Sequence, residues 1–132
     1  MATPPTPPDI LVVEDDPAFR DLLCEYLRAM GYAVYAAKDG RAATYQLMNT
    51  APSLIITDIH MPQMDGLELL VQLRETCPGI PIIAMSGRGL FDWEVTLKPA
   101  LLLGARQVLV KPFPLQGLYL SVREAIGLPK SL

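Results

Sequence analysis

Four short polar motifs each come directly after an apolar run of the sequence. Glu14-Asp15 follows ILVV, Asp58 follows LIIT, Ser86 follows IIAM and Lys111 follows QVLV. Carboxylates bind hard cations, a lysine ammonium can hold a phosphoryl oxygen, and a serine hydroxyl donates a hydrogen bond. Each motif alone is a weak signal, but four of them in equivalent positions indicate one shared site.

Two other aspartates in the same regions have a structural explanation. Asp16 precedes Pro17 at the start of an amphipathic segment, which is the pattern of a helix N-cap followed by proline at the first helical position. Asp65 precedes another helical pattern, with Glu68 three residues later, which is a capping box with an acidic cap. We therefore expect Asp16 and Asp65 to begin helices and not to take part in chemistry.

The cap explanation fails for Glu14, Asp15 and Asp58. Asp16 already fills the role of cap after the first run, and the residues MPQM separate Asp58 from the next helical pattern. Three carboxylates that converge on one edge repel each other unless a cation lies between them. A hard divalent cation with oxygen ligands resolves this repulsion, and Mg²⁺ is the usual one where a phosphoryl group also binds.

The elements that must position these residues alternate along the chain. Short, β-prone apolar runs alternate with amphipathic segments whose apolar residues recur every three or four positions. Strands are predicted over 10–13, 33–37, 54–57, 80–85 and 107–110. Helices are predicted over 17–30, 40–49, 65–76, 92–103 and 115–126. The fourth helix is expected to be kinked or to begin late near Lys98-Pro99, because proline disrupts a helix interior.

This alternation predicts an α/β fold, a doubly wound five-stranded parallel sheet with helices on both faces. Right-handed crossovers leave few topologies, and the order 2-1-3-4-5 of flavodoxin-like folds is the common five-stranded solution. In this order the site lies at the carboxyl ends of strands one and three. The four polar motifs would then meet at one edge of the sheet.

The composition is that of one globular domain. The 132 residues are 51% hydrophobic and 19% charged, which suits a single packed core. A net charge of −3 argues against a nucleic-acid-binding surface, and no apolar run approaches the ~20 residues of a membrane span. We expect a Pro-rich disordered lead-in over 1–8 without signal-peptide character, and one domain over 9–132. A cytoplasmic location and reduced thiols at Cys24 and Cys77 follow as expectations.

The motifs together resemble the receiver domain of two-component response regulators, including its stand-alone, chemotaxis-regulator-like members. The resemblance rests on ILVVEDDP, LIITDIHMPQMDG, PIIAMSG and GARQVLVKPF, and it extends from about Asp9 to Leu128. It implies that Asp58 accepts a phosphoryl group from the phosphohistidine of a sensor histidine kinase or phosphotransfer protein, or from a small acyl phosphate. Such a domain catalyses only its own phosphorylation and dephosphorylation, so we do not expect an enzyme with turnover.

The resemblance also assigns a role to each matched residue. Glu14 and Asp15 would form the acidic pair that binds Mg²⁺, with Asp15 in direct contact. Asp58 and the backbone carbonyl of His60 would complete the protein's metal ligands.

Three further assignments follow from the same resemblance. Ser86 would donate a hydrogen bond to the phosphoryl group, and Lys111 would bridge its oxygens. The Lys111-Pro112 peptide bond is expected to be cis. The family gives the imidazole of His60 no task, although a role in water access, and hence in phosphoryl lifetime, stays open as a hypothesis.

The sequence departs from the family where phosphorylation is expected to change a partner-binding face, built from the fourth helix, fifth strand and fifth helix. Val108 stands where an aromatic side chain usually lies, so an aromatic rotation cannot be the switch. The segment from Ser86 to Lys111 is about three residues longer than in common relatives. It contains Phe91, Trp93 and Leu101–Leu103, of which we expect some in the core and the rest in a partner surface.

Several interpretations stay open beside a phosphorylated switch. Arg106-Gln107 replaces the acidic pair of the DNA-binding subgroup, which puts that subgroup's dimer contacts in doubt and leaves a weak homodimer open. The chain could be a receiver-like binding module that is not phosphorylated, or a receiver excised from a larger kinase or regulator. A flavin carrier of the same architecture fits poorly, because it needs a hydroxyl- and glycine-rich phosphate loop after the first strand, where this chain has EDDP. An aspartate-nucleophile phosphatase also fits poorly, because its paired aspartates are expected after the first strand and not at Asp58-Ile59-His60. Neither nucleic acid nor membrane is an expected partner.

Overall fold

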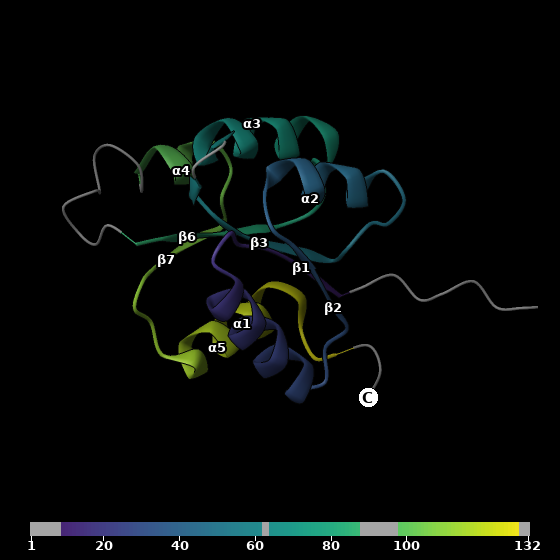
Figure 1. Cartoon of the computed structure of the whole chain (residues 1–132), viewed down its shortest axis with the longest axis vertical. Helices are drawn as coiled ribbons and strands as arrows, with labels where there is room; N and C mark the ends of the chain where they lie inside the picture. The colour runs from purple at the N-terminus through teal and green to yellow at the C-terminus, as the bar shows by residue number, and fades with distance from the viewer. Residues whose placement is uncertain (1–8, 62–63, 88–97, 130–132) are drawn as a thin grey trace, which may run out of the picture.

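A computed structural model describes residues 9–61, 64–87 and 98–129, and for residues 61 and 64–66 it describes the backbone alone. A parallel five-stranded sheet forms the centre of this structure (Figure 1). Its strands are β1 (Ile10–Val13), β2 (Val34–Ala37), β3 (Leu54–Asp58), β6 (Ile82–Ser86) and β7 (Gln107–Val110). The spatial order β2-β1-β3-β6-β7 confirms the predicted order 2-1-3-4-5.

Helices cover both faces of the sheet, as the continuous apolar strands require. Figure 1 shows α1 (Pro17–Ala29) and α5 (Leu115–Ile126) on one face. The other face carries α2 (Gly40–Leu47), α3 (Gly66–Thr76) and α4 (Lys98–Leu102). Alternate residues of β1 point into two separate hydrophobic cores, Ile10 and Val12 toward α1 and α5, Leu11 and Val13 toward the other face.

The first helix begins as predicted. The side chain of Asp16 accepts hydrogen bonds from the backbone N–H groups of Ala18 and Phe19, at 3.0 and 3.4 Å, and Pro17 takes the first helical position. The helix ends at Ala29, and Gly31 follows with a φ of 102°, which glycine adopts without a Cβ clash. Asp16 is therefore a structural residue, and this leaves Glu14 and Asp15 for the site.

Two regions differ from the predicted elements. A short antiparallel ladder of β4 (His60–Met61) and β5 (Met64–Asp65) lies where a loop was expected after Asp58. Strand β6 begins at Ile82 and not at residue 80, because Pro81 has no N–H group for the ladder. Helix α3 begins directly after Asp65, whose side chain is outside the described part, so its role as a cap stays a prediction.

The segment around α4 fits the late start expected of the fourth helix, since α4 begins at Lys98. Leu102 is 71% exposed, and Leu103 packs against the core under α2, α3 and α4. Phe91 and Trp93 lie outside the described residues. Within the described part of the chain, every helix is too short or too polar to cross a bilayer.

Candidate functional site

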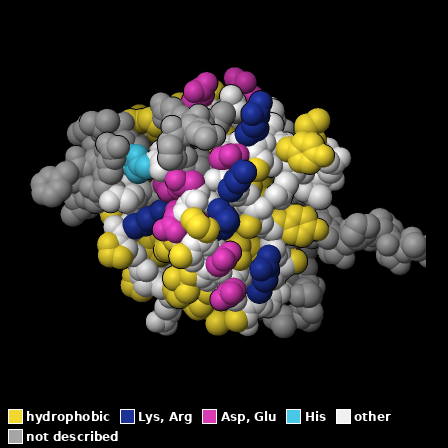
Figure 2. All heavy atoms as spheres, viewed as in Figure 1, with side chains coloured by type: hydrophobic (Ala, Val, Ile, Leu, Met, Phe, Trp, Pro, Cys, Tyr) yellow, Lys and Arg dark blue, Asp and Glu magenta, His cyan; other side chains and the backbone are white. Residues whose placement is uncertain are grey.

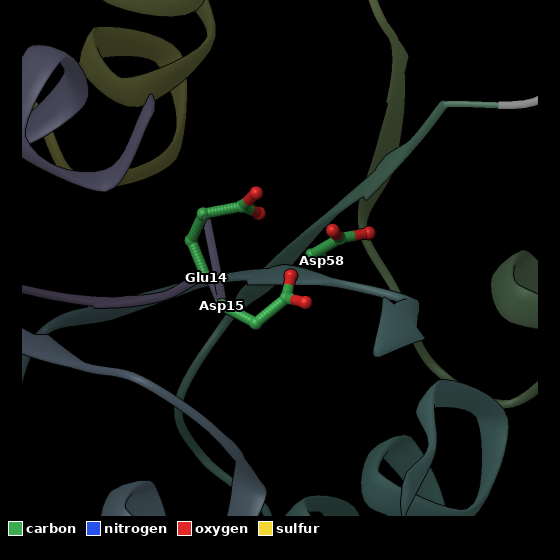
Figure 3. Close-up of side chains that lie close together, drawn as sticks. All are labelled: Glu14, Asp15 and Asp58. Carbon is green, nitrogen blue, oxygen red and sulfur yellow. The ribbon is translucent and has the colours of Figure 1, made fainter. Parts of the chain in front are cut away.

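The carboxyl ends of four strands bring the polar motifs together. Glu14 and Asp15 follow β1, Asp58 is the last residue of β3, and Ser86 is the last of β6. In the sheet Val13 is level with Thr57, Asp58 with Met85 and Ser86 with Val110, so these strands end at one edge. Figure 3 shows the carboxylates of Glu14, Asp15 and Asp58 close together at this edge.

Lys111 links two of the carboxylates from the end of β7. Its Nζ donates hydrogen bonds to Oε1 and Oε2 of Glu14 at 3.0 and 3.1 Å, and to Oδ2 of Asp58 at 3.1 Å. Glu14 is 1% exposed and Asp58 is 4% exposed, so water screens these charges poorly. The ammonium therefore offsets part of the repulsion between two buried acids.

Burial and neighbouring charges shift the pKa values of both Glu14 and Lys111 at this edge. Burial and the negative charge of Asp58 raise the pKa of the Glu14 carboxyl to about 7, although Lys111 opposes this. Burial also works against the charge of Lys111, but the attraction of Asp58 and Glu14 outweighs it and raises the pKa of that ammonium. Acidic and basic side chains are interspersed along a band of the molecular surface in Figure 2.

Asp58 is held in one orientation by partners on both of its oxygens. The backbone N–H of His60 donates to Oδ1 at 2.9 Å, and Lys111 donates to Oδ2. The carboxylate fixed in this way lies beside those of Glu14 and Asp15, where it could act as a nucleophile or as a metal ligand.

The three acids fit a hard divalent cation. One carboxylate oxygen from each of Glu14, Asp15 and Asp58 lies within 4.8 Å of the other two, and Asp15 is exposed while Glu14 and Asp58 are buried. Mg²⁺ takes oxygen ligands, usually one or two carboxylates together with waters and phosphate oxygens. The donor set is therefore suited to Mg²⁺, and the carbonyl of His60 as a further ligand stays a prediction.

Two contacts of the site were missed by sequence reasoning. Nε2 of His60 lies 3.0 Å from Oγ of Ser86, and the Lys111 ammonium lies 4.6 Å from the centre of the Phe19 ring. Phe19 lies in the amphipathic segment predicted as a helix over 17–30, and the family resemblance gives the imidazole of His60 no task. The spacing of His60, two residues after Asp58, was a weak signal because it did not fix the direction of the ring.

The backbone beside Lys111 confirms one detailed prediction. The Lys111-Pro112 peptide bond is cis. The backbone N–H of Lys111 donates to the carbonyl of Ser86 at 2.7 Å, which ties the end of β7 to the end of β6. The predicted site residues Ser86 and Lys111 thus lie side by side.

Comparison with known proteins identifies the family to which the chain belongs. The model of the response regulator receiver domain matches residues 10–123, and the chain therefore belongs to this family of two-component signalling domains. Response regulator MprA of Mycolicibacterium vanbaalenii is 38% identical over 117 residues, which is 89% of this chain and 49% of MprA. The chain thus spans about half the length of this relative.

Solved structures agree with the fold. A CheY-like receiver domain protein from Methanospirillum hungatei has a TM-score of 0.82 and 28% identity, over 92% of this chain and 94% of that one. The response regulator TrrA from Thermotoga maritima, solved in complex with Mg²⁺ and BeF, has a TM-score of 0.77 and 29% identity, over 88% of this chain and 96% of that one.

Proposed function

We propose that this chain is a phosphoacceptor signalling switch with Asp58 as the acceptor. A carboxylate oxygen of Asp58 attacks the phosphorus of a phosphohistidine on a sensor histidine kinase or phosphotransfer protein. The P–N bond breaks, an O–P bond to Asp58 forms, and the donor imidazole leaves. A small acyl phosphate would serve in the same way, with a P–O bond broken and a carboxylate released.

The observation that carries this proposal is the group of Asp58, Glu14 and Lys111 at one sheet edge, with Lys111 within 3.1 Å of both acids. Glu14, Asp15, Asp58 and the carbonyl of His60 would hold Mg²⁺. The ion would supply positive charge for the phosphoryl oxygens. Lys111 would move its hydrogen bond from Asp58 to a phosphoryl oxygen, and Ser86 would donate to another.

The output of the switch would be a changed surface formed by α4, β7 and α5. Movement of Ser86 at the end of β6 would reach this surface through β7, which pairs with β6 in parallel. Position 108 on β7 carries a valine, which packs against the core under α2, α3 and α4. Because valine has no aromatic ring, the change would not use the rotation of an aromatic side chain at this position. We expect a downstream protein to read this surface in the cytoplasm, and no nucleic acid or membrane to bind it.

Mass spectrometry after incubation with acetyl phosphate and Mg²⁺ tests the proposal. We expect the intact mass to rise by one phosphate, and this rise to be absent in Asp58→Ala and in protein treated with EDTA. Glu124→Ala is a matched control, because Glu124 is an exposed acid near the C-terminal end of α5. An unmodified wild-type mass under these conditions would instead favour a binding module that is not phosphorylated.

A further inference from the structure

The side chain of His60 forms a polar contact with the hydroxyl that is expected to follow the phosphoryl group. Nε2 of His60 lies 3.0 Å from Oγ of Ser86. Ser86 is fully buried at the end of β6, and His60 is half-buried in β4. The two side chains come from neighbouring strand ends, since Asp58 and Met85 are level in the sheet.

We propose that His60 is a positioning residue whose Nε2 accepts a hydrogen bond from the Ser86 hydroxyl and holds this hydroxyl in the unphosphorylated arrangement. The inference rests on the proposed function. It adds His60 as a second acceptor for the Ser86 hydrogen bond, in competition with a phosphoryl oxygen. Phosphorylation then exchanges one hydrogen bond for another, and His60 sets how far the switch favours its resting state.

The competition follows from the number of protons available. A serine hydroxyl has one proton to donate, and phosphoryl oxygens at neutral pH act mainly as acceptors. While that proton is donated to Nε2, it cannot also be donated to a phosphoryl oxygen. Because Ser86 is closed to solvent, bulk water cannot readily replace the lost partner.

The backbone of His60 is used separately from its ring. Its N–H holds Oδ1 of Asp58 at 2.9 Å, and that contact survives a change of side chain. His60→Phe keeps a planar ring of similar size and removes both ring nitrogens. It is therefore suited to separating the imidazole from the rest of the site.

A double-mutant cycle on phosphoryl-mimic binding tests the competition. The affinity for beryllofluoride with Mg²⁺ is measured by amide NMR titration in wild type, His60→Phe, Ser86→Ala and the double variant. We expect His60→Phe to bind about 2- to 10-fold more tightly than wild type, the range that corresponds to the loss of one hydrogen bond in the resting state. In the Ser86→Ala background the same change should leave the affinity unaltered.

The single histidine of the sequence gives a second readout that needs no variant. In tag-free, ¹⁵N-labelled protein the ring nitrogens of His60 should show the tautomer protonated at Nδ1, with Nε2 as the acceptor. Their signals should shift when beryllofluoride and Mg²⁺ are added. A ring protonated at Nε2 in the resting protein would overturn the proposal, because Nε2 could then not accept a hydrogen bond from Ser86.

The outcomes separate this inference from the proposed function. Equal or weaker affinity in His60→Phe, or the same gain in both backgrounds, overturns the role of His60 while Asp58 remains a phosphoacceptor. Absence of Asp58-dependent beryllofluoride binding in wild type counts against the proposed function itself. The tautomer of the resting protein still tests the His60–Ser86 hydrogen bond in that case.

Discussion

At the scale of single residues, Lys111 is held by a ring as well as by two acids. Its ammonium lies 4.6 Å from the centre of the Phe19 ring, and this ring meets Phe113 edge-on with centroids 5.9 Å apart. A cation over an aromatic face gains about 0.5 to 2 kcal/mol, more when the pair is shielded from water. Phe19 therefore helps to keep Lys111 over the site, where a phosphoryl oxygen would need it.

We predict that Phe19→Leu slows phosphorylation of Asp58 by acetyl phosphate about 2- to 10-fold, the range expected from loss of a moderate cation–π contact. Leucine keeps the apolar packing of α1 but lacks the aromatic face. The rate is measured by intact-mass spectrometry over time. Phe19→Tyr retains the ring and serves as the matched control, so equal rates in Phe19→Leu and Phe19→Tyr would contradict the prediction.

Residue types revealed which side chains share the site, but not how they touch. Acids after two strands, a serine after a third and a lysine after a fourth had to meet once the strand order was known. The contacts of His60 with Ser86 and of Lys111 with Phe19 depend on side-chain torsions and on the short β4–β5 ladder. A sequence pattern does not specify these torsions, because several rotamers are compatible with each backbone.

At the scale of elements, strand β2 lies at the edge of the sheet, and two side chains bind its outward-facing carbonyls. The carbonyls of Val34 and Ala36 accept hydrogen bonds from Nη2 of Arg28 and Nε2 of Gln46, each at 2.7 Å. Among the buried side-chain nitrogen and oxygen atoms of the described residues, only Oε1 of Gln46 has no hydrogen-bond partner. An unprotected edge strand is a template for pairing with another chain, so these contacts oppose self-association.

We predict that the double variant Arg28→Ala, Gln46→Leu self-associates more strongly than wild type, because the edge carbonyls of β2 become available to a second copy. Sedimentation velocity at several concentrations measures this. Arg41→Ala is the matched control, since Arg41 is an exposed residue of the same helix as Gln46. A double variant that sediments as Arg41→Ala does at every concentration would count against edge protection.

The elements themselves were largely predictable, since buried parallel strands are short continuous apolar runs and the helices between them have amphipathic spacing. The errors fall where one residue overrides the pattern. Pro81 delays the start of β6, and His60–Met61 pairs with Met64–Asp65 although no alternating apolar pattern marks these strands. A strand of two residues is too short for an alternating pattern to be recognised in the sequence.

At the scale of the whole molecule, the site lowers the stability of the protein that contains it. Glu14 has an ordinary pKa of 4.5 and a pKa of about 7 in the folded chain, chiefly through burial and then through Asp58. Between these values the folded protein holds more protons than the unfolded one, so the free energy of unfolding falls as pH rises. The loss is at most about 3 kcal/mol and is complete above the folded pKa.

We therefore predict that Glu14→Gln is as stable as wild type near pH 4.5 and progressively more stable than wild type as the pH rises to 8, by about 1 to 3 kcal/mol. Glutamine occupies the same volume and carries no proton to lose. Urea denaturation in EDTA at several pH values measures the difference. Groups that do not contact Glu14 contribute equally to both curves, so their difference reports Glu14 together with its coupling to Asp58 and Lys111.

Addition of Mg²⁺ should act in the opposite direction on the same curves. A cation held by the three carboxylates stabilises the folded state by about 2.7 kcal/mol at a concentration 100-fold above its dissociation constant. A proton on Glu14 competes with it, so wild type should gain more from Mg²⁺ at pH 8 than at pH 5.5, and Glu14→Gln should gain less at pH 8. Parallel stability curves for the two proteins without metal, or a Mg²⁺ effect independent of pH, would show that Glu14 is not the titrating group of this edge.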